Sequence, residues 1–411
     1  MPFRSVVVQA IAAALLGVAL AAPPGARAAE LLTLDRAEHL ALTHAPWYAH
    51  HRRNVAAAAE RVEYARRLPD PQLTLGALNL PADSLSLNDE DMTMLMVGLR
   101  QQFPPGDTLD LRGERARAEL NAEDARLALE ARRLQRELRE VWLELYYLER
   151  ALETVRALQP LRAAAARAAE GRYRAGVARL QEVLMERQAV ARLADREQVL
   201  IADIARQRAR LARWIGAAAD DPLPDALPEL PAVPEGFDAA HHPALRAAGA
   251  ELNAARVDVD LARQEYKPGF MAELSYGARR ERPDLVSAMV TMDLPIAPGK
   301  RQDRRVAEKR INEDGARLAA EDLKRELEAE FRAARAAHDA LAARLRIYAR
   351  DILPDARRAA EVTVAGFARD QAELREARIQ EIETRLEARR LETELAKSRA
   401  QLLYFTGESQ P

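Results

Sequence analysis

Apolar residues recur along this chain with two periods, one typical of long helices and the other typical of strands. The helical period is a spacing of alternately four and three residues, which is the heptad pattern of helices that supercoil on a partner. Two such apolar seams occur, one in each half of the chain. The first seam contains Leu134, Leu138, Val141, Leu145, Leu148, Leu152 and Val155, and the second contains Leu327, Phe331, Ala334, His338, Leu341, Leu345 and Tyr348.

The two halves carry the same order of signals, which indicates an internal duplication. Each half begins with a helical stretch that ends at a proline, and we predict these helices over residues 34–67 and 244–265. In both halves there follow a pair of alternating segments, a Pro-Gly step, a very long helix, a proline turn and a second very long helix. We therefore predict three segments, namely a first repeat at residues 30–219, a proline-rich connector at 220–243 and a second repeat at 244–408.

The alternating segments predict four strands, two in each half, because apolar and polar residues follow each other with a period of two. In the second half, Phe270 and Leu274 lie on one side of a strand, and Glu273 and Ser275 lie on the other. Each segment has about the 9–11 residues that cross a bilayer as a tilted strand. A wall with lipid on one side and water on the other requires this alternation. We therefore expect four side chains to face a water-filled lumen, namely Glu273, Ser275, Thr291 and Asp293.

Four strands cannot close a barrel, and an open sheet edge is not tolerated in lipid. Three copies of the chain would supply twelve strands, an even number that suits a closed barrel. The predicted fold class is therefore mainly α with two β-hairpins. Each chain would be an internally duplicated, long-helix protomer of an α-barrel, and its four strands would contribute to a trimeric, 12-stranded transmembrane β-barrel. A soluble hairpin that caps a coiled coil is the alternative reading of the strands.

Charge and cysteine content narrow the possible partners. The 62 Lys and Arg residues nearly balance the 64 Asp and Glu residues, so no basic stripe calls for nucleic acid and none is expected as a partner. The sequence contains no cysteine. It therefore offers no disulfide, no thiolate metal site and no lipid-bearing cysteine.

Residues 1–29 have the layout of a secretory signal peptide. Arg4 supplies the positive start, residues 6–22 form an apolar core, and Ala26-Arg27-Ala28 gives a small-x-small cleavage pattern. An N-terminal membrane anchor is the alternative, although the apolar run is shorter than the ~20 residues of a spanning helix. We expect an exported chain whose mature part has no transmembrane helix.

Catalytic and metal-binding motifs are absent from the sequence. It has no P-loop, no Gly-x-Ser-x-Gly, no His-Glu-x-x-His and no dinucleotide fingerprint, so we expect no enzyme activity and no cofactor. Several histidines gather near the starts of the two repeats, but they lack ligand spacing on one helix face, and no metal site is expected. His338 occupies a seam position and is expected to be packed or to face the lumen. The gathered histidines are His44, His50, His51, His241 and His242.

The proline turns are predicted to form one end of the long helices, at residues 157–161 and 351–355. Asp351 and Asp355 are four residues apart, a spacing that places both carboxylates on one helix face. In a trimer they would form rings of negative charge able to hold cations, and Arg350 could pair across the opening. We predict that these three residues form a gate. The alternative is that acidic residues merely favour a helix start, where the helix dipole stabilises them.

The duplicated order of elements resembles the TolC-like outer-membrane efflux protein family over nearly the whole mature chain. The stretch Gly171-Arg172-Tyr173-Arg174-Ala175-Gly176-Val177 is similar to the family's entry into a returning helix. The second copy, Gly366-Phe367-Ala368-Arg369-Asp370, departs from the pattern because Asp370 stands where glycine is usual. This departure concerns the local turn and leaves the order of elements intact.

The resemblance implies a passive duct, made of three protomers, that spans the outer membrane as a β-barrel and extends into the periplasm as an α-barrel. Its implied partners are outer-membrane lipid, a periplasmic adaptor protein and an inner-membrane resistance-nodulation-division pump. The implied cargo is small solutes, metal cations or drugs, and the heavy-metal efflux group is the nearest variety. Two alternatives stay open, a periplasmic coiled-coil structural or adaptor protein and a duct for type I protein secretion.

Overall fold

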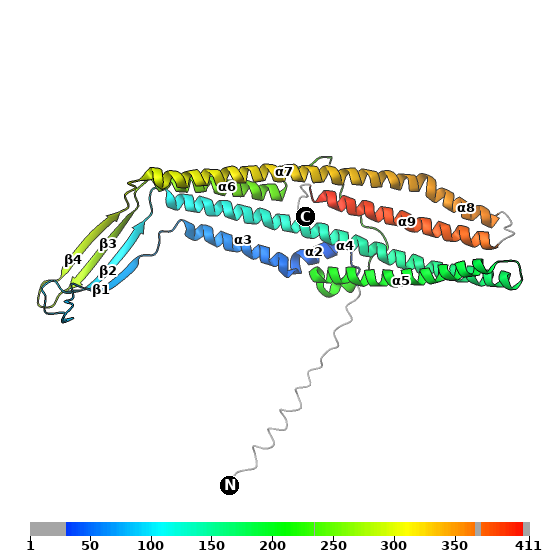
Figure 1. Ribbon diagram of the computed structural model, residues 1–411, viewed down its shortest axis with the longest axis horizontal. Helices are drawn as coiled ribbons and strands as arrows, with labels where there is room; N and C mark the ends of the chain where they lie inside the picture. The colour runs from blue at the N-terminus through cyan, green and yellow to red at the C-terminus, as the bar shows by residue number, and fades with distance from the viewer. Residues whose placement is uncertain (1–29, 234, 366–370, 406–411) are drawn as a thin grey trace, which may run out of the picture.

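The computed structural model describes residues 30–233, 235–365 and 371–405. The described chain is a long bundle of helices with one sheet at its end (Figure 1). The signal peptide predicted for residues 1–29 lies outside the described residues.

The first half of the chain contains four long helices and two strands, in the predicted order. Its elements are α2 (Leu34–His44), α3 (Pro46–Ala65), β1 (Gln72–Leu78), β2 (Met94–Phe103), α4 (Thr108–Arg174), α5 (Leu180–Ile215) and the 3₁₀ helix η1 (Gly216–Asp220).

The second half repeats this order with two differences: one helix replaces α2 and α3, and a short π-helix interrupts the longest helix. Its elements are α6 (Pro243–Gln264), β3 (Phe270–Ala278), β4 (Leu285–Met292), the 3₁₀ helix η2 (Pro298–Lys300), α7 (Gln302–Ile347), the π-helix η3 (Tyr348–Ile352), α8 (Leu353–Ala365) and α9 (Gln371–Leu403).

The four strands form one antiparallel sheet in the order β1-β2-β3-β4. The central pair, β2 and β3, comes from different halves of the chain, so hydrogen bonds between them join the two repeats. The mainly α fold with two β-hairpins is therefore confirmed. β4 is shorter than the alternating segment in the sequence and ends at Met292. Pro295, three residues further on, has no backbone N–H to donate to a neighbouring strand.

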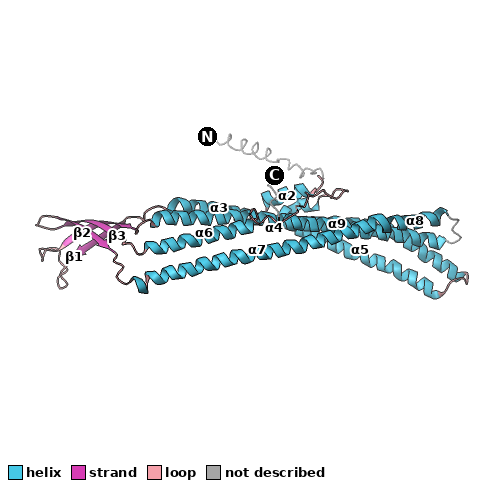
Figure 2. Cartoon of the chain, turned by 90° about the horizontal axis from the view of Figure 1, so that it is seen from above, coloured by secondary structure: helices cyan, strands magenta, loops and turns pink. Residues whose placement is uncertain are grey.

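The helices form a curved layer around α4. α3 and α5 lie end to end along one side of α4, and α6 and α9 lie end to end along the other, with α7 beyond them (Figures 1 and 2). α2 projects from one side of this layer (Figure 2). The layer thus has two long edges, one formed by α3 and α5 and the other by α7 and α8.

The main core lies midway along α4, where α2 and the connector pack on the layer. Trp142 is fully buried and donates its indole N–H to the carbonyl of Leu32 at 2.9 Å. Leu223 and Leu230 of the connector are buried in the same cluster. This packing explains why a segment rich in proline follows the surface instead of forming another helix.

The predicted proline turn at residues 157–161 is wrong. α4 continues through Pro160 for a total of 67 residues, a length of about 100 Å. Val155 and Leu158 are buried before Pro160 and Ala169 is buried beyond it, so packing holds the helix on both sides of the proline. The reversal comes at residues 175–179, where Gly176 adopts φ +73° as the left-handed residue that commonly ends a helix.

The predicted turn at residues 351–355 is wrong as well. Tyr348–Ile352 is a π-helix that leads directly into α8, and Pro354 is the second residue of α8, within the first turn, where proline is tolerated. α8 ends at Ala365 and α9, which begins at Gln371, packs against it, while the predicted turn at residues 366–370 lies outside the described residues. A third correction concerns the first helix, predicted over residues 34–67, which is split at Ala45 because the residue before Pro46 takes an extended conformation.

Candidate functional site

The sheet has one almost wholly apolar face that is open to the surroundings. Leu75 is 69% exposed and Val290 is 68% exposed, and Gln101 is the polar exception on this face. An exposed apolar patch of this extent marks a contact surface for lipid or another chain. The face consists of Leu73, Leu75, Ala77, Leu95, Val97, Leu99, Phe103, Phe270, Ala272, Leu274, Tyr276, Ala278, Val286, Ala288, Val290 and Met292.

The opposite face carries polar side chains, and the strand register brings together those predicted to line a lumen. Glu273 accepts hydrogen bonds from Arg100 Nε and Nη2 at 3.0 and 2.9 Å, across the β2–β3 pair. Ser275 and Thr291 lie on the same face, and Asp293 directly follows β4, with its backbone N–H donating to the carbonyl of Gly269 at 3.0 Å. The four residues thus share one side of the sheet, and their exposure to a lumen stays a prediction.

Both outer strands have an unpaired edge. Within the described chain, β1 pairs only with β2, and β4 pairs only with β3. Unpaired edges present free N–H and C=O groups that another strand can join. Because β1 and β4 run in opposite directions, β4 of one copy can pair antiparallel with β1 of another.

The edges of the helix layer are also incompletely packed. In the first seam every residue except Leu152 is buried. In the second seam only Leu327 and Phe331 are buried, and the other five residues are partly exposed. α7 and α5 instead carry exposed apolar residues. These are Ile311, Leu318 and Ile347 on α7, and Leu184, Met185 and Val199 on α5.

Ion pairs cross the layer close to the sheet. Glu119 of α4 pairs with Arg61 of α3 at 3.0 Å and with Arg115 at 2.6 Å. Arg115 also reaches Asp258 of α6 at 2.6 Å, and Lys309 of α7 lies 3.7 Å from the same carboxylate. Four helices are thereby connected by one belt of alternating charge.

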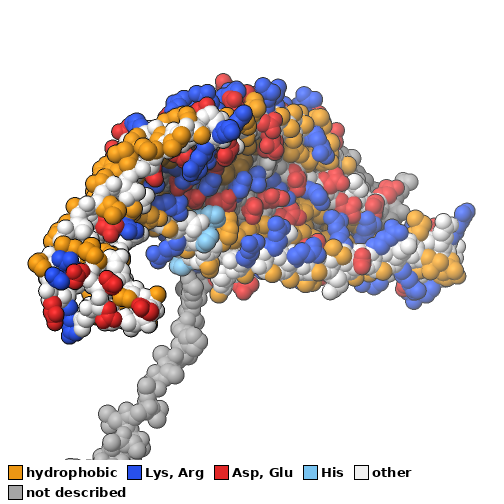
Figure 3. Space-filling view, turned by 60° about the vertical axis from the view of Figure 1, so that its left-hand side comes forward, with side chains coloured by type: hydrophobic (Ala, Val, Ile, Leu, Met, Phe, Trp, Pro, Cys, Tyr) orange, Lys and Arg blue, Asp and Glu red, His pale blue; other side chains and the backbone are white. Residues whose placement is uncertain are grey.

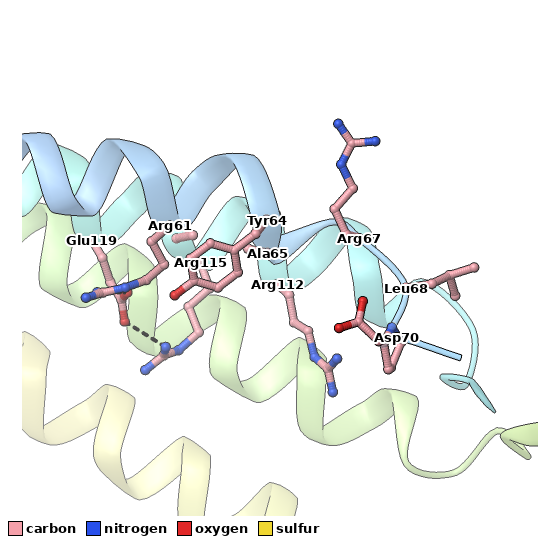
Figure 4. A pocket seen from close by; sticks show the side chains of 11 residues that line it. Arg61, Tyr64, Ala65, Arg67, Leu68, Asp70, Arg112, Arg115 and Glu119 are labelled. Atoms are coloured by element: carbon pink, nitrogen blue, oxygen red, sulfur yellow. Dashed lines mark hydrogen bonds and ion pairs between the residues drawn. The ribbon is translucent and has the colours of Figure 1, made fainter. Parts of the chain in front are cut away.

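The belt borders a recess of about 550 Å³ where α3 and α4 approach the strands. Figure 4 shows Tyr64, Arg112 and Arg115 around this recess, with Asp70 from the link to β1 at its end. More broadly, the hollowed face of the molecule is crowded with basic and acidic side chains (Figure 3). Such a surface suits contact with water and dissolved ions.

The predicted gate residues lie inside a helix and not at the reversal. Arg350 pairs with Asp351 of the same π-helix at 2.9 Å, and Asp355 lies 3.7 Å from Arg358 in α8. Both carboxylates are open to solvent, with 47% and 77% of their side chains exposed. No residue pattern in the sequence predicts the π-helix, a feature that often occurs at functional sites.

The histidines do not form a metal centre in the described part of the chain, where no group of three His, Cys, Asp or Glu side chains converges. His241 is exposed and pairs with Asp238 at 2.7 Å. His242 is fully buried beside Phe237 and Tyr404, and burial lowers its pKa to about 4, with Arg132 contributing. His338 is half-buried beside Ser398, with its pKa lowered mainly by burial.

No helix among the described residues combines the length and apolar character needed to cross a membrane.

Comparison with known proteins gives a match at the level of the fold. No protein-family model and no curated protein sequence matches the chain. Among solved structures, the outer membrane protein VceC from Vibrio cholerae superposes with a TM-score of 0.74 at 17% identity, covering 91% of this chain and 96% of VceC. CusC superposes with a TM-score of 0.74 at 14% identity, covering 91% of this chain and 92% of CusC. The MtrE outer membrane channel of Neisseria gonorrhoeae, in its open state, superposes with a TM-score of 0.73 at 15% identity. The match covers 92% of this chain and 91% of MtrE.

Proposed function

This chain has the protomer fold of the TolC-like outer-membrane channels, and we propose that it is one third of a passive duct that carries small solutes out through the outer membrane. The observation that carries the proposal is the sheet. One face is apolar and exposed, the other is polar, and both edges are unpaired. A closed barrel with lipid outside and water inside accounts for all three properties.

In a trimer, the unpaired edges of the sheet and the exposed edges of the helix layer both gain partners from neighbouring protomers. β4 of each protomer pairs with β1 of the next, which gives twelve strands. The same rotation brings α7 and α8 of one protomer against α3 and α5 of the next, so that Ile347 and Leu184 become covered. The helices then form a tube that extends into the periplasm from the barrel.

The helical end of this tube contains the gate. Asp351 and Asp355 project from the π-helix and the start of α8, about 20 Å before the reversal at 1.5 Å per residue. Rings of these carboxylates hold cations in the narrowed tube, and Arg350 limits their repulsion. Asp351→Ala combined with Asp355→Ala is expected to raise single-channel conductance and to lower the preference for cations. Unchanged conductance and ion selectivity would remove the gate assignment.

The partners of the duct are a periplasmic adaptor and an inner-membrane resistance-nodulation-division pump, since a passive duct needs a separate source of energy. The cargo is small solutes, with metal cations or drugs as candidates. A duct for type I protein secretion has the same fold. Co-purification with a pump of the resistance-nodulation-division type, in contrast to an ATP-driven exporter, separates the two.

The decisive experiment measures location, mass and conductance of the whole chain expressed in a Gram-negative host. We expect a trimer in the outer-membrane fraction that opens ion-conducting pores in planar bilayers. A soluble monomer or dimer in the periplasm, without pores, would overturn the proposal. A periplasmic coiled-coil protein would then be the correct description.

A further inference from the structure

Three methionines alternate at the start of β2. The sequence from residue 92 reads Met92-Thr93-Met94-Leu95-Met96, which contains three of the eight methionines of the chain within five residues. The two residues between the methionines point the other way: Thr93 is buried, and Leu95 belongs to the apolar face of the sheet. The alternation therefore places thioethers on the side of the sheet away from lipid.

The strand register fixes this placement for two of the three. Met96 lies between Gly76 of β1 and Gly277 of β3, in the polar face that also contains Arg100 and Glu273. Met94 is two residues further along the same face, so the two Cα atoms are about 7 Å apart. Two thioethers at this spacing can reach one ion between them.

Met92 is held close to them by the neighbouring strand end. Asn79 Nδ2 donates to the carbonyl of Met92 at 3.1 Å, and the hydroxyl of Thr93 donates to the carbonyl of Asn79 at 2.8 Å. Met92 is 54% exposed. The backbone that carries the third thioether is thus anchored while its side chain stays accessible.

The glycines beside the motif leave room for the sulfur atoms. Met94 Sδ lies 2.5 Å from the point where a Cβ atom on Gly277 would stand, so the Met94 side chain occupies the space above this glycine. Nothing lies within 4 Å of the corresponding point on Gly76. The charged neighbours are engaged with each other, because Arg282 pairs with Asp91 at 3.0 Å.

We infer that Met92, Met94 and Met96 form a binding site for a soft monovalent cation, Cu(I) or Ag(I). Soft thioether ligands select Cu(I) over the harder divalent ions, and an all-thioether site needs no deprotonation to bind. Apolar packing would not explain the motif, because the polar face fronts water. That a passing ion reaches the site rests on the proposed duct, in which the loop end of β2 lies at the exit.

The test is titration of the purified full chain in mild detergent with Ag(I) nitrate, in chloride-free buffer at pH 5.5. We expect about one Ag(I) per protomer, and we expect M92L/M94L/M96L to weaken this binding at least tenfold. Leucine keeps the apolar volume and removes the sulfur, so the folded channel should survive the change.

A matched control, M271L/M289L, removes two thioethers from other strands of the same face and should keep the binding. Absence of Ag(I) binding by the unaltered chain, or equal loss in both variants, would overturn the site. Conductance in planar bilayers is measured in parallel. Pores without Ag(I) binding would refute this inference alone, whereas binding without pores would refute the duct alone.

Discussion

At the scale of single residues, His242 shows how burial sets the chemistry of a side chain in this fold. It is fully buried, and its ring packs edge-on against Tyr404 with the ring centroids 5.4 Å apart. Burial is the main cause of its lowered pKa of about 4, and Arg132 acts in the same direction. The ring is therefore neutral in the folded chain at neutral pH.

This gives the histidine a predictable effect on stability. Because the unfolded chain binds a proton near pH 6.5 and the folded chain only near pH 4, stability is complete above 6.5 and falls as the pH drops towards 4. The loss at pH 4 is on the order of 3 kcal/mol. We expect His242→Phe to remove this part of the pH dependence, measured as the thermal midpoint between pH 7.5 and 4.5. His241→Gln, at the exposed neighbour, should behave like the unaltered chain, and parallel profiles for all three proteins would contradict the prediction.

At the scale of elements, the reversal between α4 and α5 depends on one glycine. Gly176 has φ +73°, while Gly171 lies within α4, and a Cβ at either position would meet nothing within 4 Å. Gly176→Ala should therefore cost about 1–2 kcal/mol through backbone strain alone. Gly171→Ala should stabilise α4 by about 0.5–1 kcal/mol. Thermal midpoints of the two variants test this, and equal shifts would argue that the reversal does not need the left-handed conformation.

Strand elements were predictable from the sequence where the period was clear. Glu273 and Ser275 fall on the expected face because a period of two leaves no other choice once the strand forms. Pro160 predicts a helix end, since proline usually ends a helix, whereas buried residues on both sides of it hold α4 together. The π-helix at Tyr348–Ile352 carries no local sequence signal, so the sequence predicts a turn at the gate residues, where the structure has continuous helix.

The two faces of β1 offer a direct test of which one meets lipid. Leu75 lies on the apolar face and Thr74 next to it on the polar face. Leu75→Arg should cost about 2–4 kcal/mol near the middle of a bilayer and reduce the trimer recovered from the outer membrane. Thr74→Arg should be tolerated, because its side chain lies on the polar face of the sheet. Equal recovery of the two variants would show that neither face is embedded in lipid.

At the scale of the whole molecule, both the sheet and the helix layer have surfaces that are not covered by the rest of the described chain. Within the described chain, β1 and β4 each have one unpaired edge, and the second apolar seam is far less buried than the first, although the two have the same spacing of apolar residues. The sequence predicted both seams, but their unequal burial depends on which helix lies at an edge, and this is a property of the assembled layer. In the proposed trimer, a single threefold rotation would supply partners for β1, β4 and α7 together.

Closure by three copies can be tested with disulfides, because the chain has no cysteine of its own. Within one protomer, β1 and β4 are three strand spacings apart, about 14 Å, which is too far for a disulfide. Thr74→Cys should therefore cross-link only to β4 of a neighbouring copy. It is combined in turn with one of four changes on the same face, namely Leu285→Cys, Ser287→Cys, Met289→Cys or Thr291→Cys.

We expect at least one of these pairs to give covalent trimers, with dimers as partial products, on a non-reducing gel of the membrane fraction. Leu75→Cys with Ser287→Cys is the matched control, because the two side chains lie on opposite faces and should not join. Monomers in every pair would mean that β1 and β4 do not meet. A ladder that continues beyond the trimer would mean that the strands join in an open array, in which an unpaired edge always remains and a sealed duct cannot form.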